Sequence, residues 1–175
     1  PRGEGGHGLE WAQDSWLTEQ AVKAVRLETK QLVIAKLSPE VVDIQPIAKA
    51  AVEAGADAIS VMNTIRGLAI DLEKRKPVLA NITGGLSGPA IKPIALRLVW
   101  QVAQAVKVPV MGIGGIMNWK DALEFILAGA TAVQVGTANY ISPRVTLEII
   151  QGIEGYLRKN KIKKVQELIG VAHSS

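Results

Sequence analysis

Short apolar runs alternate with amphipathic stretches along most of this chain, and glycine, proline or polar residues separate them. Four runs have the length and the aliphatic content of buried strands: Leu32–Leu37, Ala58–Asn63, Val108–Ile113 and Ala132–Val135. Near-continuous apolar strands of this kind are typical of parallel sheets covered by helices. The pattern therefore predicts four parallel strands.

Helices are predicted beside these strands from apolar residues at helical spacing and from capping residues at the ends. The first begins at Asp14 or Ser15 and runs to about Glu28. The others are Asp43–Ala54, Ile91–Val106, Asn118–Ala128, Val145–Lys159 and Val165–Gly170. Alternating strands and helices form right-handed βαβ units, which occur in both closed barrels and open sheets.

One segment, Thr64–Pro89, is too long for an ordinary connection between a strand and a helix, and long connections are usually functional. It contains Gly84, Gly85 and Gly88. Gly88-Pro89 places proline in the first turn of the helix that follows, and helix N-termini bind anions. We expect these glycines to offer backbone N–H groups to a ligand.

Two further glycine elements follow the last two predicted strands. Gly114-Gly115 comes at the end of one strand and Gly136-Thr137 at the end of the next. Without a Cβ, the backbone can approach an anion closely, and in (β/α)8 barrels the loops after the last two strands commonly bind phosphate. A barrel needs eight strands, and this chain supplies about four. The prediction is an α/β fold: residues 1–175 form one partial domain, the C-terminal half of a (β/α)8 barrel, with a phosphorylated ligand.

Polar residues at two strand ends are candidates for further ligand contacts. Lys36 ends an otherwise apolar strand and is costly to bury without a negative partner or access to water. Asn63-Thr64 ends the next strand, where Asn offers both an acceptor and donors to a planar polar ligand, or simply caps a turn. His173 lies in a tail that we expect to fray, and no acidic cluster has metal-ligand spacing.

Composition and charge narrow the function classes. The 175 residues contain no cysteine, which excludes disulfides, thiolate metal sites and a cysteine nucleophile within this chain. The net charge of +4 is concentrated in Arg158–Lys164, where no aromatic residues interleave, so a solvated helix end is expected and a nucleic-acid site is not. No apolar run is long enough to cross a membrane and no secretory signal is recognised, so a cytoplasmic location is expected.

The motifs together resemble a known family. Lys36-Leu37-Ser38-Pro39, Asn63-Thr64 and the segment from Leu79 to Pro93, with its Leu86-Ser87-Gly88-Pro89-Ala90-Ile91-Lys92-Pro93, are similar to the catalytic subunit of class 1B, NAD-linked dihydroorotate dehydrogenase. Gly112-Ile113-Gly114-Gly115-Ile116 and Val135-Gly136-Thr137-Ala138-Asn139 continue the resemblance in order. It extends from about Gly5 to the final helix.

The resemblance implies a flavin oxidoreductase of pyrimidine biosynthesis that oxidises dihydroorotate to orotate with FMN. It places Lys36 and Met62 at the flavin ring, and Asn63 and Thr64 at the substrate. It assigns the ribityl phosphate region to Gly88, Gly114, Gly115, Gly136 and Thr137. An iron–sulfur flavoprotein subunit is the implied electron acceptor.

The family's catalytic cysteine precedes a segment that Pro1–Gly6 resembles, so no catalytic base is expected in this chain and the chain alone is expected to be inactive. The missing N-terminal half of the barrel, or a second copy, is an expected partner. Two alternatives remain: the FMN domain of a dihydropyrimidine dehydrogenase, and a non-catalytic half-barrel that binds phosphate.

Overall fold

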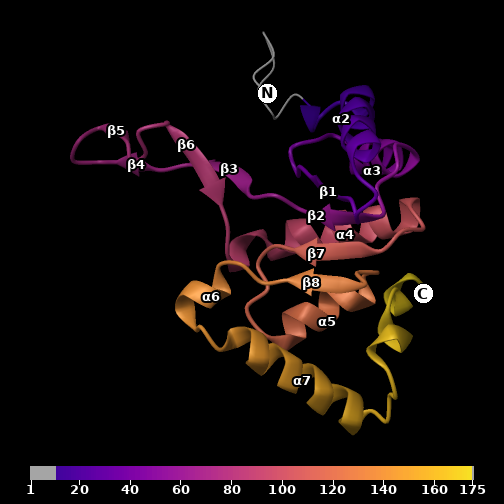
Figure 1. Ribbon diagram of the computed structural model, residues 1–175. Helices are drawn as coiled ribbons and strands as arrows, with labels where there is room; N and C mark the ends of the chain where they lie inside the picture. Colours follow the sequence, from indigo (N-terminus) through magenta and orange to yellow (C-terminus); the bar gives the residue numbers. More distant parts are fainter. Residues whose placement is uncertain (1–10, 175) are drawn as a thin grey trace.

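The computed structural model describes residues 11–174, and its centre is a four-stranded parallel sheet (Figure 1). The strands are β1 (Ile34–Leu37), β2 (Ala58–Val61), β7 (Val110–Ile113) and β8 (Ala132–Gln134). They lie in the order β1-β2-β7-β8, with Lys36, Ser60, Met111 and Ala132 at one level across the sheet. The four predicted strands and their parallel arrangement are confirmed, with slightly narrower bounds.

Five helices of nine or more residues accompany the sheet: α2 (Ser15–Glu28), α3 (Ile44–Glu53), α4 (Lys92–Ala105), α5 (Trp119–Leu127) and α7 (Val145–Lys159). A short 3-10 turn, η1 (Pro89–Ile91), leads into α4. The expected caps are present, because Asp14 accepts a hydrogen bond from the Leu17 N–H at 2.9 Å and Asp43 accepts one from the Gln45 N–H at 3.0 Å. The predicted starts of these two helices are therefore confirmed.

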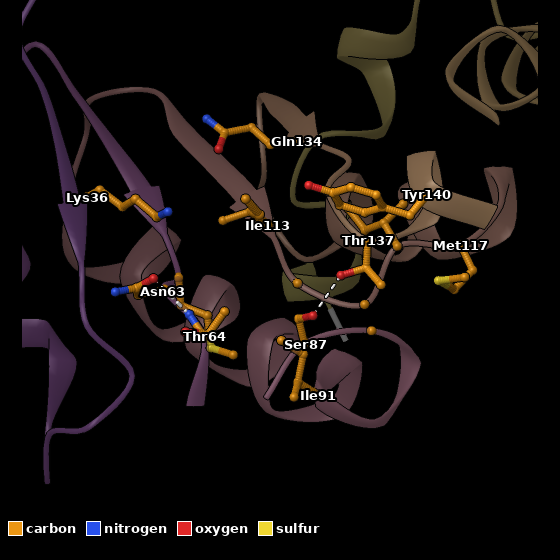
Figure 2. A pocket seen from close by; sticks show the side chains of 16 residues that line it. Lys36, Asn63, Thr64, Ser87, Ile91, Ile113, Met117, Gln134, Thr137 and Tyr140 are labelled. Carbon is orange, nitrogen blue, oxygen red and sulfur yellow. Dashed lines mark hydrogen bonds between the residues drawn. The ribbon is translucent and has the colours of Figure 1, made fainter. Parts of the chain in front are cut away.

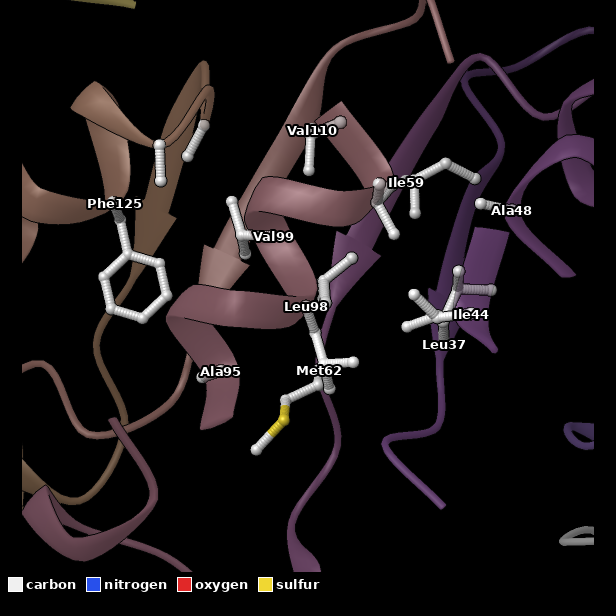
Figure 3. Close-up of a cluster of buried hydrophobic side chains, with 14 of the residues drawn as sticks. Leu37, Ile44, Ala48, Ile59, Met62, Ala95, Leu98, Val99, Val110 and Phe125 are labelled. Atoms are coloured by element: carbon white, nitrogen blue, oxygen red, sulfur yellow. The ribbon is translucent and has the colours of Figure 1, made fainter. Parts of the chain in front are cut away.

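The hydrophobic core lies between the sheet and the helices that cover one of its faces. Ile59 and Val110 occupy paired register positions, and both pack into the cluster that contains Leu98 and Val99 of α4 (Figure 3). The opposite face is open, since Ile34 in β1 remains 43% exposed. The sheet therefore buries its helix-facing residues, while on its other face Ile34, Lys36 and Ala132 are exposed and Ala58 and Ser60 are buried.

The long segment before α4 is an arm of two antiparallel hairpins rather than an irregular loop. In this hairpin arm, β3 (Ile65–Leu68) pairs with β6 (Thr83–Leu86), and β4 (Ile70–Asp71) pairs with β5 (Lys76–Pro77). The arm projects away from the parallel sheet (Figure 1). Gly84 and Gly85 pair with Gly67 and Arg66 inside it, so strand pairing accounts for these two glycines and their role as ligand donors stays a prediction. The strands escaped the sequence pattern because they are short and rich in glycine.

The last part of the chain packs against the outside of the sheet layer. A short helix, α6 (Ala138–Ile141), precedes α7, and two 3-10 turns follow, η2 (Val165–Leu168) and η3 (Val171–Ser174). The predicted helix Val165–Gly170 is thus a 3-10 turn. His173 does not lie in a frayed tail, because its Nε2 is 3.0 Å from the Ala128 carbonyl oxygen and its ring packs edge-on against Trp100.

The surface of the described residues agrees with the expectation of a solvated helix end near the C-terminus. The basic residues of Arg158–Lys164 are exposed at the end of α7 and in the turn that follows. None of the helices within residues 11–174 combines the length and the apolar character needed to cross a bilayer. The segment Pro1–Gly6, which carries the expectation about the catalytic base, lies outside the described residues.

Candidate functional site

A cavity of about 250 Å³ lies at the carboxyl edge of the parallel sheet (Figure 2). The nine residues that the family resemblance assigned to flavin or substrate line it: Lys36, Met62, Asn63, Thr64, Gly88, Gly114, Gly115, Gly136 and Thr137. Gly84 and Gly85 do not line it. They come from four strand ends and from the segment that opens α4. The carboxyl ends of parallel strands are where barrels and open α/β sheets bind ligands.

Backbone hydrogen bonds continue the sheet beyond the end of β2. They hold Met62 and Asn63 at the end of the cavity that also contains Lys36. The Met62 N–H donates to the Ile113 carbonyl at 3.1 Å, and the Asn63 N–H donates to the Leu37 carbonyl at 3.1 Å. Lys36 is exposed on the open face of β1, and its side chain reaches toward this end of the cavity (Figure 2). The cation and the amide thus lie on neighbouring strands, as predicted.

Asn63 combines both interpretations that the sequence left open. Its Oδ1 accepts the Thr64 N–H at 2.9 Å, which is a local turn contact. Its amide nitrogen donates to no protein acceptor in the described part of the chain. Two N–H donors are therefore available to a ligand while the carbonyl oxygen orients the side chain.

The glycine turns form the other end of the cavity. Gly114 and Gly115 have φ angles of +134° and +74°, which L side chains rarely adopt. A Cβ on Gly115 would lie 2.8 Å from both the Gly88 carbonyl oxygen and the Lys92 nitrogen, so the two backbone segments are in contact. Within residues 11–174, the N–H groups of Gly114, Gly115 and Gly136 donate to no protein acceptor. Such unpaired N–H groups are suited to an anion.

Seven further cavity residues were not predicted: Ser87, Ile91, Ile113, Ile116, Met117, Gln134 and Tyr140. Gln134 had a recognisable signal, because it interrupts an apolar strand as Lys36 does. Ser87 accepts a hydrogen bond from the Thr137 hydroxyl at 2.8 Å and joins the α4 entrance to the turn after β8 (Figure 2). The apolar members carry no sequence signal that distinguishes them from core residues.

An ion-pair network supports the glycine turns from outside the cavity. Lys92 Nζ lies 2.7 Å from Asp121 Oδ1 and 3.0 Å from Glu124 Oε2. Burial tends to raise the pKa of Asp121, but hydrogen bonds from Lys92 and from the Met117 N–H outweigh it and hold that pKa below its usual range. The hydrogen bond to Asp121 raises the pKa of Lys92 above its usual value. Both groups are therefore charged at neutral pH.

The fold and the cavity define a class of protein: half of a parallel (β/α)8 barrel with a ligand site at the carboxyl edge and glycine turns suited to an anion. A family model described as "Dihydroorotate dehydrogenase" matches residues 2–157, and the chain belongs to this family. The predicted family and the predicted half-barrel are both confirmed.

Curated relatives agree with this assignment. The chain is 60% identical over 163 residues to the "Dihydroorotate dehydrogenase B (NAD(+)), catalytic subunit" of Geotalea uraniireducens, covering 93% of this chain and 53% of the relative. It is 57% identical over 163 residues to the protein of the same name from Alkaliphilus metalliredigens, covering 93% and 54%. The chain thus spans about half the length of the curated relatives it matches.

A solved structure matches the fold of this chain over about half of its own length. The dihydroorotate dehydrogenase of Eimeria tenella, solved in complex with ferulenol, superposes with a TM-score of 0.79 at 26% identity. The match covers 96% of this chain and 51% of the Eimeria chain. In fold, this chain therefore corresponds to about half of the Eimeria chain.

Proposed function

We propose that this chain supplies the FMN- and orotate-binding half of an NAD-linked dihydroorotate dehydrogenase, an enzyme of pyrimidine biosynthesis. One observation carries the proposal: in a member of this family, every residue expected to contact flavin or substrate lines the same cavity. The sites are far apart in the sequence, from residue 36 to residue 137, so their convergence is a property of the fold.

The cavity fits the phosphate end of FMN. Among the described residues, no atom lies within 4 Å of the position that a Cβ on Gly136 would take, so this backbone faces open space. With Gly88, Gly114, Gly115 and Thr137, it would hold the phosphate through backbone N–H groups. Charge-assisted hydrogen bonds of this kind are the strong ones.

The opposite end fits the flavin ring. Met62 and Lys36 would lie against it, and the flavin, when bound, would supply the hydride-accepting chemistry. The Lys36 ammonium favours negative charge on the ring, an effect that strengthens where water is excluded. In the FMN-loaded protein, Lys36→Ala should therefore lower the flavin reduction potential, by roughly 30 mV for each ~1.4 kcal/mol of lost interaction. Lys49→Ala on the surface of α3 is the matched control. An unchanged reduction potential in Lys36→Ala would contradict the proposed position of Lys36 beside the flavin ring.

Asn63 and Thr64 are proposed to hold the substrate. Orotate is a planar pyrimidine and dihydroorotate its form saturated at C5–C6, and both carry carbonyl acceptors and N–H donors around the ring. The free amide N–H groups of Asn63 and the hydroxyl of Thr64 match such an edge.

Turnover is proposed to need more than these 175 residues. The chain contains no cysteine to act as the family's base, and loss of a general base typically costs about 10²–10⁴-fold in rate. The rest of the barrel and an iron–sulfur flavoprotein subunit that carries electrons to NAD are the proposed partners. The names of the relatives favour this reading over a dihydropyrimidine dehydrogenase domain.

Flavin titration tests the proposal and separates it from a half-barrel that binds only phosphate. The chain is titrated with FMN and with riboflavin while flavin fluorescence is recorded, alone and with the remaining barrel half of a relative added. We expect FMN to bind more tightly than riboflavin, and orotate to perturb the spectrum of the bound flavin. A chain that binds neither flavin under either condition would contradict the proposed function.

A further inference from the structure

Lys92 stands beside the proposed phosphate site without facing it. It is in the first turn of α4, four residues after Gly88, yet it is not among the residues that line the cavity. Its ammonium instead contacts two carboxylates of α5, Asp121 at 2.7 Å and Glu124 at 3.0 Å. The side chain thus ties α4 to α5.

Asp121 carries that tie to the backbone that follows the glycine turn. Its Oδ1 binds Lys92, and its Oδ2 accepts the Met117 N–H at 2.9 Å and the Asn118 N–H at 3.2 Å. Met117 itself lines the cavity, two residues after Gly115. One buried carboxylate therefore connects the start of α4 with the chain between β7 and α5.

The two connected backbones touch at the cavity. A Cβ on Gly115 would lie 2.8 Å from the Lys92 nitrogen and from the Gly88 carbonyl oxygen. The same Cβ would lie 2.8 Å from the Lys92 Cβ, and a Cβ on Gly114 would lie 2.8 Å from the Ala95 Cβ, so packing limits how closely the turn can approach α4. Packing resists a closer approach but does not hold the two segments together. A lateral restraint is needed, and Lys92–Asp121 is placed to provide it.

We propose that the Lys92–Asp121 pair is a positioning clamp, which holds the Gly114-Gly115 turn against the start of α4 and so aims its N–H groups at the phosphate of the bound flavin. This inference rests on the proposed function for the identity of the anion. Lys92 acts through Asp121 and does not touch the ligand.

The alternative is that Lys92 swings out and binds the phosphate directly. The two hypotheses predict opposite changes of phosphate affinity in Asp121→Asn. If Lys92 is a direct ligand, Asp121→Asn frees it and removes a negative charge near an anion, so phosphate affinity should rise. If the pair is a clamp, Asp121→Asn weakens the tie, and affinity should fall.

The experiment measures dissociation constants for FMN and riboflavin in Lys92→Met, Asp121→Asn and Lys92→Arg, with the rest of the barrel present. Glu124→Gln removes a neighbouring negative charge but keeps the Lys92–Asp121 bond, and Arg97→Met removes a positive charge from the exposed face of α4. We expect both Lys92→Met and Asp121→Asn to lose about tenfold or more in FMN affinity, the worth of one charge-assisted hydrogen bond, with riboflavin affinity unchanged. Lys92→Arg, Glu124→Gln and Arg97→Met should remain near wild type.

A flavin-free readout keeps the inference separate from the proposed function. Backbone ¹⁵N order parameters of Gly114 and Gly115 should fall in Lys92→Met and stay unchanged in Arg97→Met, with near-UV circular dichroism reporting that both are folded. Wild-type chain that fails to prefer FMN would overturn the proposed function, while the order parameters would still decide the clamp. Unchanged order parameters in Lys92→Met, or a gain of FMN affinity in Asp121→Asn, would overturn the clamp.

Discussion

At the scale of single residues, glycines that look alike in the sequence have different reasons for being glycine. Gly114 has a positive φ, and a Cβ there would lie 2.8 Å from the Cβ of Ala95. Gly136 has no protein neighbour within 4 Å of such a Cβ. The fold itself requires glycine at position 114. At position 136 the fold leaves space, so a ligand could be the reason for glycine there.

Substitution by valine should separate these two requirements. Gly136→Val should leave the stability of the chain near wild type and lower FMN affinity by roughly 1.5–3 kcal/mol per lost hydrogen bond, or about ten- to a hundredfold. Gly114→Val should instead destabilise the chain, by about 1–3 kcal/mol from overpacking alone. Chemical denaturation and FMN titration measure the two effects. If Gly136→Val binds FMN as tightly as wild type, the turn at Gly136 does not contact the phosphate.

At the scale of elements, the helices are held to one another by contacts that the helical pattern does not reveal. Gly152 in α7 is covered by the indole of Trp119 from α5, so a Cβ there would overlap that ring, whereas Gly155, one turn later, faces open space. In the sequence, both are glycines inside a helix, where glycine lowers the helix propensity. Only Gly152 has a packing reason.

Substitution by alanine is expected to change the stability of the chain in opposite directions at Gly152 and Gly155. Gly155→Ala should stabilise the chain by about 0.5–1 kcal/mol, because alanine is the better helix former and meets no obstacle. Gly152→Ala gains the same propensity but must displace Trp119, with a cost of about 1–3 kcal/mol. Urea unfolding of both variants makes the comparison, and equal stabilities would show that Trp119 moves freely.

The link between α4 and α5 also predicts a pH dependence. The pKa of Asp121 is lower in the folded chain, so its contribution to stability is present above its unfolded pKa, about 3.9, and is lost as pH falls through the folded value. The pKa of Lys92 is raised, so its contribution is lost only at strongly alkaline pH. The difference in unfolding free energy between wild type and Asp121→Asn should be constant from about pH 5 to 9 and shrink below about pH 4. A difference that grows in acid would contradict the ion-pair assignment.

At the scale of the whole molecule, the parallel sheet has two edge strands, β1 and β8, and an open face. Ile34 at the β1 edge is 43% exposed, and Leu32 just before it is 70% exposed. Unpaired strand edges and exposed apolar residues favour pairing with another chain. In the relatives, about as much sequence again accompanies the part that this chain matches.

We therefore expect the isolated chain to self-associate or to pair with the remaining barrel half. Sedimentation velocity at micromolar concentration checks this, with charged substitutions at Leu32 and Ile34 as a test of the edge. A well-folded monomer across that range would contradict the prediction. Dihydroorotate oxidation should be absent from the chain alone and should return when the complementary half is added.

The sequence by itself predicted the four strands, their parallel arrangement and the main helices, and the family resemblance supplied the nine residues that line the cavity. The strands and helices follow from local rules, because burial imposes apolar runs and caps need particular side chains. The tertiary structure alone decided that Gly84 and Gly85 belong to a hairpin arm, that Gly114 and Gly136 differ in what surrounds them, and that Lys92 faces Asp121 rather than the cavity. Those distinctions depend on which atoms lie opposite a residue in space, and contacts between residues 29 positions apart leave no local trace in the chain.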